Sequence, residues 1–266
     1  MNRNNQWKTR LGKIVAAAAC VLLLAPALQA APEAANQPME LNGDVITYTS
    51  KTGVMTARGG IKMTQGAAVL TGDAGEYNTK TKEAVATGSV KVIKEGSTLT
   101  AAEVRSFDDM KRLLATGNAL LVNKDGATAA GPRMEYFPDR QYGNVTGGAR
   151  LTNKDAWLTS SVAEVFFKED RATADGNVHI VSDTRKLDAV SDHGVYYGIN
   201  GKNGRAVLTG NVRAVQNGDV LTGNHVTMYL DDSALDSDGR STLVIQPKKQ
   251  TTPDAKTISE PGKGNL

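Results

Sequence analysis

The stretch AVLTGNVRAVQNGDVLTGNHVTMY, residues 206–229, predicts two adjacent β-strands. Apolar and polar residues alternate on both sides of Asn217-Gly218, a dipeptide typical of a two-residue hairpin turn. Gly210 interrupts the first of the two strands. Because glycine weakens the middle of a strand unless the chain bends or bulges there, the stretch predicts a hairpin that contains a bend.

The same pattern occurs five more times earlier in the chain, with a period of about 29 residues. Each copy has a glycine just before a short apolar strand: Gly59, Gly88, Gly117, Gly147, Gly176 and Gly210. A second series lies eleven positions after each glycine: Leu70, Leu99, Thr128, Leu158, Leu187 and Leu221. A third series is aromatic: Tyr48, Tyr77, Phe107, Phe137, Phe167, Tyr197 and Tyr229. The three series recur with the same period and at nearly constant offsets from one another, which indicates a repeat array.

Short turns rich in glycine, asparagine and aspartate separate the predicted strands, which favours an antiparallel meander of about 12–16 strands. A row of bends at one register would fold such a sheet along a line. The sequence therefore predicts an all-β fold, a creased antiparallel β-jelly roll that is open at both ends. A parallel β-helix is the alternative, but its strands pair in parallel, and the hairpin turns argue against it.

Alternation within the strands separates an apolar inner face from a mostly charged outer face. We expect the inner residues to line an apolar groove: Ile61, Met63, Leu70, Val90, Val92, Leu99, Leu121, Leu151, Leu158, Val178, Ile180, Leu187, Val212 and Leu221. Aromatic residues make up only 5% of the chain, so large side chains do not fill this interior. Either the two walls close on small residues, or the interior holds another molecule, for which acyl chains are the natural candidate.

The outer row between these positions is largely basic: Lys62, Lys91, Leu120, Arg150, His179 and Arg213. These cations could meet lipid phosphates, or they could form an ordinary solvated face.

The chain divides into four segments. Residues 1–30 have basic residues, then an apolar run, then small residues, and are predicted to be a cleaved secretory signal peptide. Residues 31–38 are a linker, residues 39–246 the repeat domain, and residues 247–266 a tail expected to be disordered.

The signal carries four basic residues and no acids, so subtracting it from the formal net charge of +3 leaves −1. This balance argues against nucleic-acid binding.

The predicted sheet has two free edges. One contains Val45 and Ile46, and the other contains Leu243, Val244 and Ile245. Free edges carry unpaired backbone groups that invite another strand. Contacts between unlike edges do not close on themselves, so we expect head-to-tail assembly into rods.

No arrangement of side chains indicates an enzyme, a metal site or a cofactor. His179, His193 and His225 occupy different places in their repeats, and we expect them not to converge. The aspartates near the C-terminal end lack the spacing of a calcium loop.

The stretch MELNGDVITYTSKTGVMTARGGIKMTQGAAVLTGDAGEY, residues 39–77, resembles the opening of periplasmic lipopolysaccharide (LPS) transport proteins of the LptA/OstA family. The resemblance extends to about residue 246 and implies a periplasmic β-jelly roll that carries LPS from the inner to the outer membrane, with the acyl chains in its groove. It implies partners of the same fold in both membranes. Two alternatives stay open: a membrane-anchored partner of the same pathway that keeps its apolar N-terminal run, and a structural β-repeat protein without lipid cargo.

Overall fold

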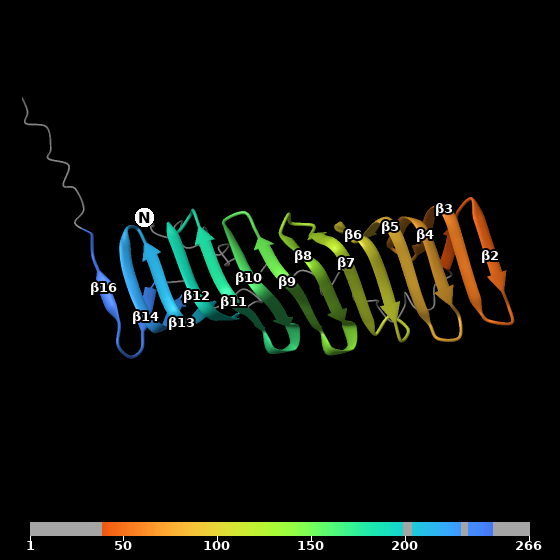
Figure 1. Ribbon diagram of the computed structural model, residues 1–266. Coiled ribbons are helices and arrows are strands. Elements are labelled where there is room, and N and C mark those ends of the chain that lie inside the picture. Colours follow the sequence, from red (N-terminus) through yellow and green to blue (C-terminus); the bar gives the residue numbers. More distant parts are fainter. Residues whose placement is uncertain (1–38, 199–203, 230–233, 247–266) are drawn as a thin grey trace, which may run out of the picture.

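The computed structural model describes residues 39–198, 204–229 and 234–246, in which sixteen strands form one antiparallel sheet (Figure 1). The strands are β1 Met39–Asn42, β2 Val45–Thr49, β3 Val54–Gln65, β4 Ala68–Asn78, β5 Glu83–Lys94, β6 Ser97–Phe107, β7 Arg112–Val122, β8 Thr128–Phe137, β9 Tyr142–Thr152, β10 Ala156–Phe166, β11 Arg171–Ser182, β12 Leu187–Tyr197, β13 Arg205–Gln216, β14 Asp219–Tyr229, β15 Ala234–Ser237 and β16 Thr242–Val244. Strands β3 to β14 follow one another in chain order. This arrangement confirms the predicted antiparallel jelly roll and excludes the β-helix.

Helical structure in the described residues is limited to two 3-10 turns, η3 (Pro138–Arg140) and η4 (Phe167–Glu169). No helix in this part of the chain is long and apolar enough to cross a membrane. The predicted signal peptide, linker and tail lie outside the described residues.

A β-bulge at each repeat glycine bends the sheet. In β3, Gly59 and Gly60 both have positive φ, and these two residues lie opposite the single residue Asp73 of β4. The same pairs recur once in each odd-numbered long strand: Gly59-Gly60, Gly88-Ser89, Gly117-Asn118, Gly147-Gly148, Gly176-Asn177 and Gly210-Asn211. Glycine and asparagine adopt this left-handed conformation most readily. The second residue of each pair is also left-handed, which explains why glycine, serine or asparagine follows every repeat glycine.

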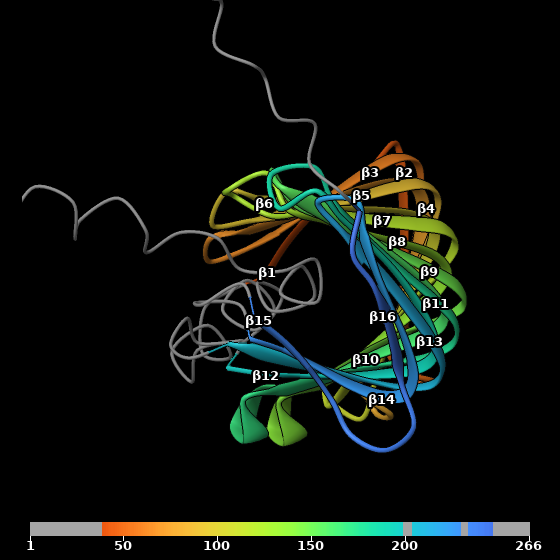
Figure 2. The same cartoon turned by 90° about the vertical axis from the view of Figure 1, so that its left-hand side faces the viewer.

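Because the bulges share one register, they crease the whole sheet along a line and divide it into two walls that enclose a common interior (Figure 2). Wall 1 contains the residues that precede each bulge and their partners, such as 54–58 paired with 74–78. Wall 2 contains the residues that follow it, such as 61–65 paired with 68–72. Each wall has one inner and one outer face, since side chains alternate along the strands.

Each end of the sheet is formed by two short strands in place of one long one. At the first end, β1 pairs with the wall 2 half of β3, and β2 pairs with the wall 1 half. At the last end, β15 and β16 pair with the two halves of β14 in the same way. The sequence predicted the apolar residues of β2 and β16, but it did not predict that each edge is split at the crease.

Two positions of the second repeat series lie elsewhere than predicted, because their hairpin turns are longer. Gln65 pairs with Ala68 across a two-residue turn, whereas four residues separate Ser182 from its partner Leu187. As a result Ala189, rather than Leu187, stands in the row of Leu70 and Leu158. Leu187 still faces inward, since a shift of two residues preserves the face of a strand. After the longer turn at Asn123 the shift is one residue, so Ala129 stands in the inner row and Thr128 lies on the outer face.

Substituting the bulge glycines tests the crease. A Cβ on Gly117, whose φ is +79°, would lie 2.5 Å from the Cβ of Ala102, whereas a Cβ on Gly126, with a φ of +88°, has no neighbour within 4 Å. We expect Gly126→Ala to lower the free energy of unfolding by about 1–2 kcal/mol through the left-handed backbone alone. Gly117→Ala should cost about 1–3 kcal/mol more through the collision. Urea denaturation of both variants measures this, and equal losses would contradict a close-packed crease.

Candidate functional site

An apolar row runs along the inner face of wall 2 from one end of the sheet to the other. Successive members are direct cross-strand partners: Leu41, Met63, Leu70, Val92, Leu99, Leu121, Ala129, Leu151, Leu158, Ile180, Ala189, Ala214, Leu221 and Leu243. No polar residue interrupts it. The row gives the interior one continuous apolar surface, which is the main feature of the candidate site.

The facing row on wall 1 consists mostly of smaller side chains. From β2 to β14 its members are Ile46, Ala57, Gly75, Ala86, Val104, Ala115, Met134, Val145, Ala163, Ala174, Gly194, Leu208 and Val226. One buried cluster joins both walls from Leu99 in β6 to Met228 in β14. Of the two arrangements that the sequence left open, the walls close on small residues over this length.

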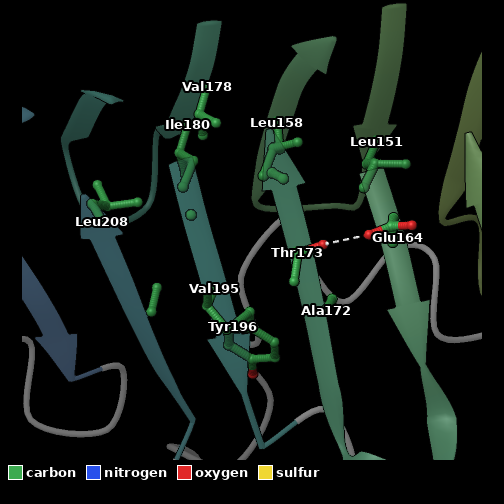
Figure 3. Close-up of a pocket in the computed structure, with 13 residues that line it drawn as sticks. Leu151, Leu158, Glu164, Ala172, Thr173, Val178, Ile180, Val195, Tyr196 and Leu208 are labelled. Atoms are coloured by element: carbon green, nitrogen blue, oxygen red, sulfur yellow. Dashed lines mark hydrogen bonds between the residues drawn. The ribbon is translucent and has the colours of Figure 1, made fainter. Parts of the chain in front are cut away.

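An apolar hollow in the closed part lies between β9 and β13 (Figure 3). It is lined by Leu158, Val178, Ile180 and Leu208, among others, and its volume is about 20 Å³. A volume of this size holds about one water molecule. An acyl chain therefore requires the two walls to move apart here.

The interior is less tightly closed near the first end of the sheet. The buried cluster there has only four members, Ala57, Ile61, Ala86 and Val90. Met63, Leu70 and Val92 of the wall 2 row are only partly buried, whereas their counterparts Leu151 and Leu158 are 2% exposed. The apolar surface is thus accessible at this end without a change in the central cluster.

A wider hollow opens at the last end of the sheet, between β15 and β16. Its volume is about 390 Å³. Leu221, Leu235 and Leu243 supply its apolar part, and Asn217, Asp219, Ser237 and Ser241 belong to its polar part. Both ends of the apolar row therefore meet accessible surface.

The structure places all fourteen residues predicted for the groove on the inner face of wall 2. Eleven of them are at most 9% exposed, and the other three, Met63, Leu70 and Val92, belong to the looser first end. The prediction that they contact lipid remains a prediction. Sequence reasoning missed the wall 1 row, because alanine and glycine gave it no apolar signal.

The predicted edge residues are among the most exposed apolar side chains of the described residues. Val45 is 61% exposed, Leu243 59% and Ile245 68%, and Ile46 and Val244 accompany them. Isolated exposed apolar residues are common, but a group at each free edge indicates a surface that another strand can cover.

Charged residues on the outer face of wall 1 are largely paired. Arg112 and Arg133 both contact the Glu135 carboxylate, at 2.5 and 2.7 Å. Burial of Glu135 raises its pKa, but hydrogen bonds from Arg112 and then Arg133 outweigh burial, and the pKa ends below its ordinary value. Nearby, a hydrogen bond from Arg105 likewise lowers the pKa of Glu103.

The histidines do not form a metal site. His179 contacts Asp188 on wall 2, and His193 contacts Asp175 on wall 1. His193 and His225 lie in one outer row with Thr209 between them, a proximity that sequence position did not predict. Within the described residues, no group of three or more histidine, cysteine or acidic side chains could hold a metal ion.

Comparison with known protein families gives one match. Residues 69–163 match the family model described as LptA/(LptD N-terminal domain) LPS transport protein. Residues 69–163 therefore form a segment of this LptA-like family. The matched residues extend from β4 to β10, and the match confirms the family resemblance found in the sequence.

Among solved structures, the chain is similar to LptH from Pseudomonas aeruginosa, the LptA-homologous periplasmic component of a lipopolysaccharide transport device. The two are 12% identical, and the match covers 81% of this chain and 100% of that chain with a TM-score of 0.18. A search of curated proteins returned no match.

The paired charges on wall 1 predict a pH-dependent contribution to stability. The pKa of Glu135 is lower in the folded chain, so its stabilising effect is present above the unfolded pKa and is lost as pH falls through the folded value. We expect Glu135→Gln to lower the free energy of unfolding at neutral pH by on the order of 1 kcal/mol. In acid, the loss should shrink towards zero.

Glu76 provides the control, because it lies on the same outer face and has no ion pair among the described residues. Glu76→Gln should change stability little at either pH. Chemical denaturation across this pH range tests the contribution, and a loss in Glu135→Gln that is equally large in acid would contradict it.

Proposed function

We propose that this chain is a periplasmic bridge that carries LPS from the inner to the outer membrane, with the acyl chains between its two walls. The observation that carries the proposal is the apolar row from Leu41 to Leu243, which reaches both free ends of the sheet. A groove that is apolar along its whole length suits a cargo that is passed along it. LPS is the cargo that its family transports.

Opening of the walls is compatible with the way they pack. Side chains of the central cluster, such as Leu151, Val165 and Leu208, are apolar, so the contacts between them are non-directional. An acyl chain that replaces these contacts keeps the same surfaces out of water. Because the walls are joined along the crease, they can separate on the open side while the strand ladders stay intact.

The free edges support assembly into a longer bridge. Each end of the sheet has a free edge within the described chain. At one end the outer sides of β1 and β2 have no strand partner, and at the other end the outer sides of β15 and β16 have none. A second copy, or a related jelly-roll domain of an inner- or outer-membrane transport protein, could add a strand there. Head-to-tail addition would align successive grooves into one path. A role of this kind requires no catalytic residue, metal or cofactor.

A structural repeat protein without cargo is the second candidate function, and the dry cluster from β6 to β14 favours it. The membrane-anchored alternative depends on residues 1–38, outside the described structure, and the mass of the exported protein would distinguish it.

Photo-crosslinking from adjacent residues tests whether the interior holds lipid. Val92 faces the looser part of the groove, and its neighbour Lys91 faces outward. A photo-reactive residue at position 92 should label LPS, and one at position 91 should label it at least about tenfold less, because strand neighbours point to opposite faces. A probe at Leu121 should label once the walls have parted. Equal labelling from positions 91 and 92 would reject the groove and favour the cargo-free alternative.

Sedimentation tests the edge contact. We expect the average mass of the protein, with residues 1–30 removed, to rise with concentration. Val244→Pro should keep it near the monomer, because proline removes a backbone donor from the edge strand. Val244→Thr keeps the donor and should still associate. Monomeric behaviour of the parent at high concentration, together with failure to bind any jelly-roll partner, would reject the bridge.

A further inference from the structure

The outer face of wall 2 combines unpaired cations with exposed apolar side chains. Its row nearest the crease contains Lys62, Thr71, Lys91, Thr100, Leu120, Ala130, Arg150, Thr159, His179, Val190, Arg213 and Thr222. The next row contains Thr64, Val69, Ile93, Thr98, Val122, Thr128, Thr152, Trp157, Val181, Asp188, Val215 and Val220. We call these two rows the cationic face.

The charges on the cationic face are not balanced. Asp188 is the single acidic residue of the two rows, and it contacts His179 at 3.1 Å. Within the described residues, Lys62, Lys91, Arg150 and Arg213 make no ion pair with a carboxylate. The outer face of wall 1 differs, since Glu103 and Glu135 there are each paired with arginine. The cations of wall 2 are therefore available to an anionic partner.

Apolar side chains project between these cations. Away from the free edges, the exposed large apolar residues of the described chain include Ile93 at 38%, Leu120 at 37% and Val190 at 37%, all on the cationic face. Trp157 lies beside them, with the Arg150 guanidinium 5.1 Å from its ring centre. A surface needed only for solubility would not gather its exposed apolar residues among its cations.

We propose that the cationic face binds the surface of a bilayer that contains anionic phospholipids. Lys62 and Lys91 stand two strands apart in this row, roughly 10 Å. Arg150 and Arg213 follow at steps of four strands, roughly 19 Å each. Such a row matches an extended anionic surface better than a compact ligand. Exposed Ile93, Leu120 and Val190 can enter the headgroup region while the cations meet phosphates. This role goes beyond LPS transport and does not depend on the groove, which lies on the opposite face of the same wall.

Vesicle flotation of the protein without residues 1–30 tests the proposal. We expect it to float with vesicles of phosphatidylcholine mixed with phosphatidylglycerol, to float much less with phosphatidylcholine alone, and to be released by salt. Each cation removed from the surface should weaken vesicle binding about fivefold. Lys91→Glu combined with Arg213→Glu should therefore lower binding by about thirtyfold or more. Both side chains are exposed, so the fold should persist, and circular dichroism checks it.

The matched control is Arg58→Glu combined with Lys111→Glu. It changes the net charge equally but lies outside the cationic face, on the outer face of wall 1 and in the turn before β7. It should retain most of the binding. Equal losses in the two double variants, or no binding by the parent, would overturn the proposal.

A third variant separates a lipid surface from a soluble acidic partner. Leu120→Ser combined with Val190→Ser keeps every cation and removes two apolar contacts. It should weaken vesicle binding and leave binding of soluble polyglutamate unchanged. Unchanged vesicle binding would overturn the assignment to a bilayer and indicate a general anion-binding face. LPS crosslinking from position 92 should persist in all these variants, so failure here is distinguishable from failure of the groove.

Discussion

Two consecutive left-handed residues in every odd-numbered long strand determine the form of this molecule. A flat sheet of sixteen strands would expose both faces to water. The pairs from Gly59-Gly60 to Gly210-Asn211 bend it at one register and bring two apolar faces together. The crease also creates two separate outer faces, and these carry different chemistry. The glycines are thus required by backbone conformation, and at Gly117 also by the close approach of Ala102.

Small side chains then decide how the walls meet. Ala163, Ala174 and Gly194 let wall 1 approach the larger residues of wall 2, so the central interior is closely packed. The closed state can reopen readily, because the contacts between the walls are mainly apolar and non-directional. The two ends differ from the centre: one is loosely packed around Met63 and Leu70, and the other contains a hollow beside Leu221 and Leu243. A closed centre between two accessible ends is consistent with a conduit that opens as cargo enters.

Much of this architecture could be predicted from the sequence, because the same local pattern of residues recurs in every repeat. Alternation identified the inner faces, turn dipeptides identified the hairpins, and the glycines located the crease. The shift of the row from Leu187 to Ala189 could not be predicted, since it depends on the length of one turn. The closed interior could not be predicted either, because alanine and glycine in a sequence do not indicate which surface packs against them. The sequence already placed Lys91 and Arg213 in one basic outer row, but only the register of the even-numbered strands shows that Asp188 is the one acidic residue among their neighbours on that face.

The most direct measurement is native mass spectrometry of the protein incubated with intact LPS and, separately, with its deacylated saccharide. An apolar interior that takes up acyl chains predicts an adduct with the mass of intact LPS and no adduct with the saccharide. Binding of both molecules to the same extent would mean that recognition takes place outside the groove. Binding of neither would mean that the two walls form a permanent core, and would contradict the central claim that they part around lipid.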